Sequence, residues 1–242
     1  MDIDISQLID DIDGELQIEA DPAYREQIRT QYNMDVENFW GVRMPAIRAI
    51  GARHYKRLQA LDVDRRLEVC RALLETRLYE HRIMAFHWAY LARRGHAARH
   101  LEMFASWLDE YVDDWIDCDD LCNRVVGDFL LRFPERAGAV LAWTGSPNLW
   151  MRRGAAVSLV LPARRGQQLE VVLAVADALL EDTEDLVQKG YGWMLKEASR
   201  SHPQEVFDYV VSWRGTMPRV ALRAAIKKLP EHLRREAMGK RS

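Results

Sequence analysis

The chain has 242 residues, of which 48% are hydrophobic and 29% are charged, and its formal net charge is −3. This composition is typical of a folded globular protein and excludes disordered and collagen-like chains. No apolar run approaches the roughly 18 residues needed to cross a bilayer. The first residues are acidic, whereas a signal peptide begins with basic ones. We therefore expect a cytoplasmic protein without a membrane segment.

The charge is distributed unevenly along the chain. Residues 146–242 contain 16 basic against 11 acidic residues, a balance of +5, and residues 1–145 contain 18 against 26, or −8. Eight of these acidic residues lie in an acidic N-terminal segment, residues 1–21, which contains no basic residue. The C-terminal part can thus present a cationic face to a polyanion, although an uneven solvated surface is the simpler interpretation.

The hydrophobic pattern predicts helices from end to end. Apolar residues recur at intervals of three and four, and no stretch alternates apolar and polar residues for long enough to predict a strand. No linker is rich enough in Gly, Ser or Pro to divide the chain, so we predict an all-α protein with a single domain over residues 1–242. The helices are interrupted, in chain order, at Asp21-Pro22, Met44-Pro45, Gly95, Phe133-Pro134, Gly145-Ser146-Pro147, His202-Pro203 and Met217-Pro218.

A two-helix unit occurs twice, over residues 134–157 and 203–226. Weaker copies of its second helix begin at Leu78 and Asp185, so the units recur at roughly the 40-residue period of HEAT-like repeats. Such hairpins bury their apolar faces only against their neighbours, which predicts an α-solenoid whose second helices line one concave face. A basic row on these helices suits a phosphate backbone, although each arginine alone could instead pair with an acid of the next unit. The row consists of Arg82, Arg124, Arg152, Arg153, Lys189, Arg219 and Arg223.

The cysteine and histidine residues do not predict a metal site. Cys70, Cys118 and Cys122 include no C-x-x-C pair, so we expect reduced thiols that serve mostly in packing. His96 and His100 have the spacing of two ligands on a helix, but the third ligand of a zinc site is missing. We expect neither a metal nor a cofactor.

The densest polar cluster, residues 113–120, runs directly into a predicted apolar helix over residues 121–133. A calcium loop would need a glycine at its sixth position and a late glutamate, and both are missing. A helix cap needs only one carboxylate, so the excess of carboxylates beside Trp115 marks a candidate site. The acids that could cap the helix are Asp117, Asp119 and Asp120.

Three of the eight tryptophans are predicted at the starts or on the first turns of the second helices, namely Trp115, Trp150 and Trp193. Trp115 and Trp193 lie among Asp, Gly, Lys and Glu, which is the setting of an aromatic ring that contacts the sugars and bases of nucleic acid. The remaining large group lies among apolar neighbours and is predicted to pack in the core. Its members are Trp40, Trp88, Trp107, Trp143 and Trp213.

Four segments together resemble the AlkD-type DNA alkylation repair glycosylases, a family of HEAT-like repeat proteins. They occur in the family's order and spacing, and the resemblance covers nearly the whole chain. The segments are residues 40–50 (Trp-Gly-Val-Arg-Met-Pro-Ala-Ile-Arg-Ala-Ile), residues 115–119 (Trp-Ile-Asp-Cys-Asp) with Gly127-Asp128, residues 150–153 (Trp-Met-Arg-Arg), and residues 188–197 (Gln-Lys-Gly-Tyr-Gly-Trp-Met-Leu-Lys-Glu).

The resemblance implies a role for individual residues. Asp119 would be the catalytic carboxylate, with Trp115 and Trp193 on either side of the lesion nucleotide and Arg153 in contact with the DNA. Extra acids surround Asp119, so a share of the catalytic role for Asp117 stays open. The basic row adds further residues expected to bind DNA, namely Arg152, Lys189 and Arg223.

The implied activity is that of a monofunctional DNA N-glycosylase. Members of the family excise purines alkylated at N3 or N7 from duplex DNA without inserting the base into a pocket. We expect the same substrate here, with a monomeric enzyme and double-stranded DNA as its partner. One alternative is a non-catalytic HEAT-like protein that binds branched or distorted DNA. Less favoured is a protein–protein scaffold, a common function of α-solenoids.

Overall fold

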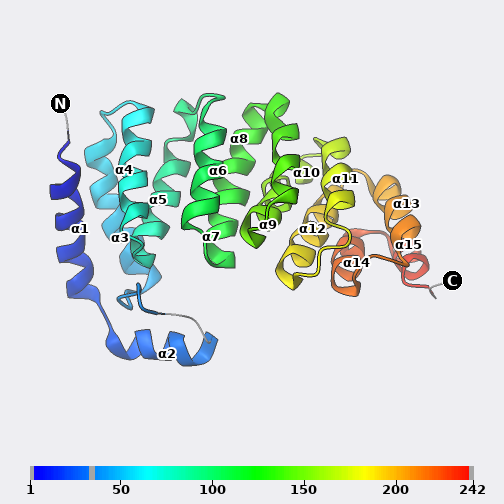
Figure 1. Ribbon diagram of the computed structural model, residues 1–242, viewed down its shortest axis with the longest axis horizontal. Coiled ribbons are helices and arrows are strands. Elements are labelled where there is room, and N and C mark those ends of the chain that lie inside the picture. Colours follow the sequence, from blue (N-terminus) through cyan, green and yellow to red (C-terminus); the bar gives the residue numbers. More distant parts are fainter. Residues whose placement is uncertain (1–2, 33–35, 240–242) are drawn as a thin grey trace. The chain divides into compact units, whose positions relative to one another are not determined.

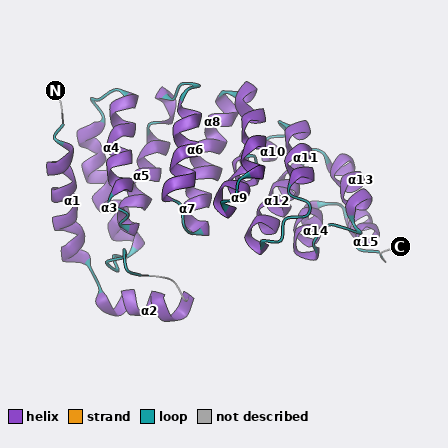
Figure 2. Cartoon of the chain, viewed as in Figure 1, coloured by secondary structure: helices purple, strands orange, loops and turns teal. Residues whose placement is uncertain are grey.

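The computed structural model describes residues 3–32 and 36–239, and every regular element within them is helical (Figure 2). The prediction of an all-α protein is confirmed, and no strand occurs in these two ranges. None of the described helices combines the length and the apolar character that a membrane span requires. The chain divides into two compact units, Met1–His96 and Ala97–Ser242. The single domain over residues 1–242 stays a prediction.

The first unit consists of helix pairs preceded by an acidic helix. Helix α1 packs against α3 and α4, and α4 packs against α5 (Figure 1). The helices of this unit are α1 (Ile5–Glu19), α2 (Pro22–Tyr32), α3 (Met44–Tyr55), η1 (Lys56–Leu58), α4 (Val63–Glu75), α5 (Tyr79–Leu91) and η2 (Arg93–Gly95).

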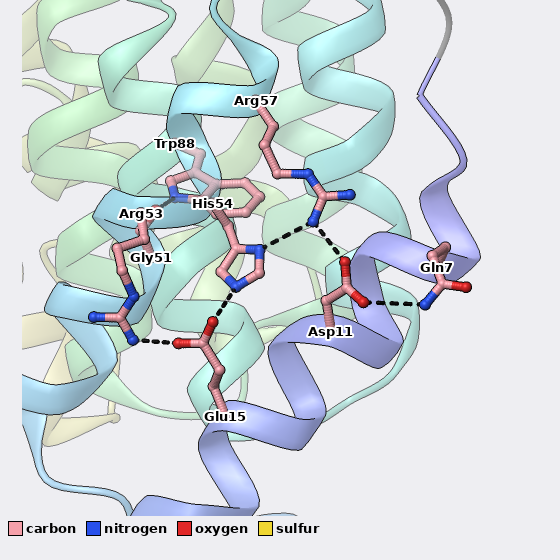
Figure 3. Close-up of polar contacts among 8 residues, drawn as sticks. All are labelled: Gln7, Asp11, Glu15, Gly51, Arg53, His54, Arg57 and Trp88. Carbon is pink, nitrogen blue, oxygen red and sulfur yellow. Dashed lines mark hydrogen bonds and ion pairs between the residues drawn. The ribbon is translucent and has the colours of Figure 1, made fainter.

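The acidity of the N-terminal segment has a structural use in α1. One face of this helix is apolar and fully buried, through Leu8, Ile12 and Leu16. Its carboxylates reach basic side chains of α3 and the residues just after it (Figure 3). Glu15 pairs with Arg53 and with Nε2 of His54, the latter at 3.0 Å, and Asp11 pairs with Arg57 at 2.6 Å. The acidic helix therefore neutralises basic side chains in its own unit.

The second unit contains the predicted repeat. Residues 134–157 form η4 and α9, which pack together, and residues 203–226 form α13 and α14. The second helices stack in chain order, with α9 against α7 and α12, and α12 against α14. The helices of this unit are α6 (His100–Tyr111), α7 (Trp115–Asp119), η3 (Asp120–Val126), α8 (Gly127–Arg132), η4 (Pro134–Gly145), α9 (Leu149–Ser158), α10 (Val160–Arg164), α11 (Leu169–Ala178), α12 (Asp185–Ala198), α13 (Pro203–Trp213), α14 (Arg219–Ala225), η5 (Ile226–Lys228) and α15 (Glu231–Ala237).

The helix predicted over residues 121–133 is not a uniform α-helix. Asp120–Val126 form a π-helix, η3, and the α-helical part, α8, begins only at Gly127 and ends at Arg132. Pro134–Gly145 form a 3-10 helix, η4. Spacing at three and four residues does not separate these helix types, because each of them returns an apolar side chain to the same face after three to five residues.

Most of the predicted packing residues lie in the core. The three cysteines are free and buried, as expected. Trp88, Trp107 and Trp143 are buried, whereas Trp40 is partly exposed. The prediction is wrong for Trp213, which is 40% exposed. Its repeat equivalent, Trp143, lies in η4, against which α11 of the next hairpin packs, whereas α13 belongs to the last hairpin of the stack.

Candidate active site

The first turn of α7 is organised by Asp114. This residue is the N-cap of α7, and its Oδ1 accepts hydrogen bonds from the backbone nitrogens of Ile116 at 2.6 Å and Asp117 at 2.9 Å. The sequence had suggested Asp117, Asp119 or Asp120 as the cap, and that assignment is wrong. Capping by Asp114 accounts for one acid of the cluster and leaves Asp119 to another role.

The acid cluster also brings three possible cation ligands together. Carboxylate oxygens of Asp113, Asp114 and Asp117 lie within 4.8 Å of one another. Asp114 is engaged in capping and Asp117 is 1% exposed. Acids near a helix start are stabilised by the helix dipole without any ion, so the cluster has a structural explanation.

Asp119 lies at the end of α7, directly before the π-helix η3. Its Oδ1 accepts a hydrogen bond of 2.7 Å from Nη2 of Arg153, on α9, and the two side chains form an ion pair. The side chain of Asp119 is 24% exposed, so the carboxylate is held on one side and reaches the surface on another. π-helical turns are rare and frequently occur at functional sites, which agrees with the position of this carboxylate.

Opposing effects act on the ionisation of Asp119. Desolvation raises the pKa of this carboxyl above its ordinary value, while the charge and hydrogen bond of Arg153 lower it. The neighbouring negative charges of Asp120 and Asp114 raise it further. The net result is a raised pKa, although the guanidinium favours the charged form through a short charge-assisted hydrogen bond.

The predicted tryptophans differ in their relation to this carboxylate. Trp115 is the first residue of α7, one turn before Asp119 and therefore on the same helix face, and it is 53% exposed. Trp193 lies on α12 and is partly exposed, and Nζ of Lys196 lies 5.7 Å from the centroid of its ring. The structure thus groups Trp115 with Asp119 and Arg153, and places Trp193 on the helix to which Arg153 bonds.

Two of the predicted DNA contacts are engaged inside the protein. Nε of Arg152 pairs with the largely buried carboxylate of Asp182 at 2.6 Å, and its Nη1 donates to the carbonyl oxygens of Ser146 and Pro147. Arg153 donates to Asp119 and, from Nη1, to the carbonyl oxygen of Leu186 at 2.6 Å. Each arginine therefore links neighbouring repeats, as the structural alternative for single arginines had predicted.

The exposed cations lie farther along the row. Lys189 has 53% of its side chain exposed and pairs with Asp185, one turn earlier, at 2.5 Å. Arg223 is exposed on α14. Lys227 and Lys228, which are not among the predicted residues of the row, are also exposed, and so is Arg219, which belongs to the predicted row. In the described part of the chain, Arg219, Arg223, Lys227 and Lys228 form no ion pair.

These residues share one position of the repeat. Asp119, Arg153, Lys189 and Arg223 follow one another at intervals of about 35 residues on successive second helices. A single acid therefore begins a row that is otherwise basic, and its nearest basic neighbour in the row is bonded to it. The repeat spacing was available in the sequence and could have predicted the pairing of Asp119 with Arg153.

Comparison with known proteins agrees with this architecture. Solved structures with the same fold include "Predicted DNA alkylation repair enzyme from Enterococcus faecalis", with a TM-score of 0.75, 17% identity and coverage of 89% of this chain and 99% of that one. The smu.31 protein of Streptococcus mutans UA159 has a TM-score of 0.58 and 16% identity, with coverage of 86% and 98%. AlkD2 from Streptococcus mutans has a TM-score of 0.55 and 15% identity, with coverage of 93% and 99%.

The sequence comparisons identify a family. Identities this low show the fold alone, and no curated protein matches the chain. The family model described as "DNA alkylation repair enzyme" matches residues 12–229, which is most of the chain. The chain belongs to the DNA alkylation repair enzyme family.

Proposed function

We propose that this protein is a DNA glycosylase that excises purines alkylated at N3 or N7 from duplex DNA. The observation that carries the proposal is the partly exposed carboxylate of Asp119, paired with Arg153 and one helical turn from the exposed ring of Trp115. Membership of the family supports DNA as the substrate and alkylation damage as the lesion.

The chemistry requires little more than a fixed negative charge. Alkylation at N7 or N3 gives the purine a positive charge, so the base leaves as a neutral molecule when the bond to C1′ breaks and its electron pair moves to the base. The sugar then has oxocarbenium character. A carboxylate at Asp119 stabilises this charge, and water forms the new bond to C1′ and releases a proton. No general acid, metal or cofactor is needed for this step.

The tryptophans complete the proposed site. A cationic base or sugar against an aromatic face gains about 1 kcal/mol, and more when both are desolvated. Trp115 offers such a face beside Asp119, and Trp193 offers another on α12. In this arrangement the lesion is contacted where it lies, so the protein avoids the unstacking cost of a base-flipping enzyme.

Binding of the DNA backbone is assigned to the exposed part of the basic row. Lys189 and Arg223 can reach phosphates, and Arg219 and Lys227 lie one turn before and after Arg223. Arg152 also belongs to the DNA contacts expected from the sequence, although its donors are used within the protein. The proposed enzyme acts as a monomer in the cytoplasm.

Release of free base from duplex DNA that contains 7-methylguanine tests this function. Wild-type protein should release the base, and Asp119→Asn should bind the same DNA without releasing it. Salt-dependent DNA binding without release by the wild type would instead support a non-catalytic protein for branched or distorted DNA. Absence of both would support a protein–protein scaffold.

A further inference from the structure

Arg153 lies inside the second unit, although the sequence marks it as a DNA contact. The residue is only 5% exposed, and two of its nitrogen atoms donate to groups of the protein itself. One bond goes to Asp119 on α7 and the other to the carbonyl oxygen of Leu186 on α12. Lys189, at the equivalent position of the next helix, has 53% of its side chain exposed. A phosphate can therefore reach Lys189 far more readily than Arg153.

The side chain of Arg153 packs against Gly190 on the surface of α12. A Cβ atom at Gly190 would lie 3.4 Å from Cγ and 3.6 Å from Nη1 of Arg153. These distances are ordinary van der Waals contacts, so the side chain of Arg153 lies directly against this part of α12.

We propose that Arg153 is a positioning residue that holds the Asp119 carboxylate by bracing α7 against α12, and that it does not bind a DNA phosphate. This inference rests on the glycosylase function proposed above and replaces the role that the resemblance implies. The guanidinium is a rigid fork, so it fixes Oδ1 of Asp119 from one side. No described residue bonds to Oδ2, which leaves that oxygen available to the sugar or the attacking water.

The same contact favours the charged form of the carboxylate. Burial raises the pKa of Asp119, and Arg153 opposes this increase through its charge and its hydrogen bond. Removal of the arginine should therefore raise the pKa further and reduce the charged fraction at a given pH. It should also release the orientation of the carboxylate, and a displacement of about 1 Å can lower a rate on the order of 100-fold.

The test compares Arg153→Gln with Lys189→Gln, a matched control at the equivalent position of the next helix. Duplex DNA binding is measured across salt concentrations, and the ionisation of Asp119 is followed by NMR of ¹³C-labelled aspartate carboxyl groups, assigned with Asp119→Asn. The salt slope is the slope of the logarithm of the DNA-binding constant against the logarithm of the salt concentration. We expect Arg153→Gln to keep the wild-type salt slope and to raise the pKa of Asp119. Single-turnover base release should fall on the order of 100-fold. Lys189→Gln should lower the slope by about one and leave that pKa in place.

A salt slope reduced by about one in Arg153→Gln, with the pKa of Asp119 unmoved, would show a phosphate contact and overturn the proposal. Both measurements work without catalysis. Absence of base release by the wild type would therefore reject the glycosylase function and still leave the role of Arg153 to be decided by slope and pKa.

Two further variants keep the test decisive if Arg153→Gln does not fold. Gly190→Val retains both charges but crowds the arginine, so we expect a raised pKa of Asp119 and an unchanged salt slope. An unmoved pKa in this variant would count against the proposal. Arg153→Lys keeps the positive charge but lacks the planar guanidinium group. The pKa of Asp119 should therefore stay close to its wild-type value, whereas the rate of base release should be only partly retained.

Discussion

Replacement of Trp115 by alanine separates a contact with DNA from a role in packing. A fully buried tryptophan loses about 3–5 kcal/mol of stability on truncation to alanine. Trp115 keeps 53% of its surface exposed, so only about half of that loss, ~2 kcal/mol, is expected. For a chain of this size the corresponding fall in Tm is roughly 4–8 °C. The lost aromatic contact should slow excision about tenfold, because ~1.4 kcal/mol of transition-state stabilisation disappears.

The matched control for this variant is Trp107→Ala. Trp107 is 1% exposed in the same unit, so its truncation should cost the full ~3–5 kcal/mol while the excision rate per folded molecule stays near that of the wild type. Thermal unfolding and single-turnover excision of 7-methylguanine are measured on both variants. A Tm loss at Trp115 as large as that at Trp107, with excision reduced only in proportion to unfolded protein, would refute the assignment of Trp115 to the site.

Three further predictions concern charged residues. Asp119→Asn should keep the fold and the DNA affinity but lose most base release. In the wild type, base release should fall as the pH drops through the raised pKa of Asp119, because protonation removes the stabilising charge. A pH–rate profile without this decrease at acidic pH would contradict the catalytic role of Asp119. Lys189→Ala and Arg223→Ala should each lower the salt slope of DNA binding by about one, measured by titration at several salt concentrations, and unchanged slopes would exclude phosphate contacts. Arg152→Ala should lower the free energy of unfolding by about 3 kcal/mol in chemical denaturation, because the largely buried carboxylate of Asp182 loses its partner. A loss below about 1 kcal/mol would show that water replaces the arginine as the partner of Asp182.

The sequence predicted those features that depend on local pattern. Helical spacing and proline positions were sufficient to predict an all-α chain, and the similarity of residues 134–157 to residues 203–226 predicted the repeated hairpin. Apolar surroundings identified Trp88 and Trp107 as core residues. These predictions succeeded because an amphipathic helix in a repeat buries the same face in each unit.

The sequence did not predict features that depend on tertiary neighbours. The apolar surroundings of Trp213 resemble those of Trp143, but the last hairpin leaves the ring exposed. The sequence predicted a helix start after Asp120, whereas α7 already begins at Trp115 with Asp114 as its N-cap. The role of Arg153 likewise depends on what lies on either side of it, because a basic residue in the row can pair with a neighbouring repeat or extend into solvent.

The π-helix η3 lets the chain carry an extra residue beside Asp119 without turning α7 away from α9. A π-helical segment holds about one residue more than the α-helix that would replace it, so the two segments give nearly the same total rotation between α7 and α8. Deletion of one residue from Asp120–Val126 should therefore restore α-helical hydrogen bonding and leave Asp119 and Trp115 facing Arg153. Within this family, the length of this segment is therefore expected to differ by one residue without loss of the site.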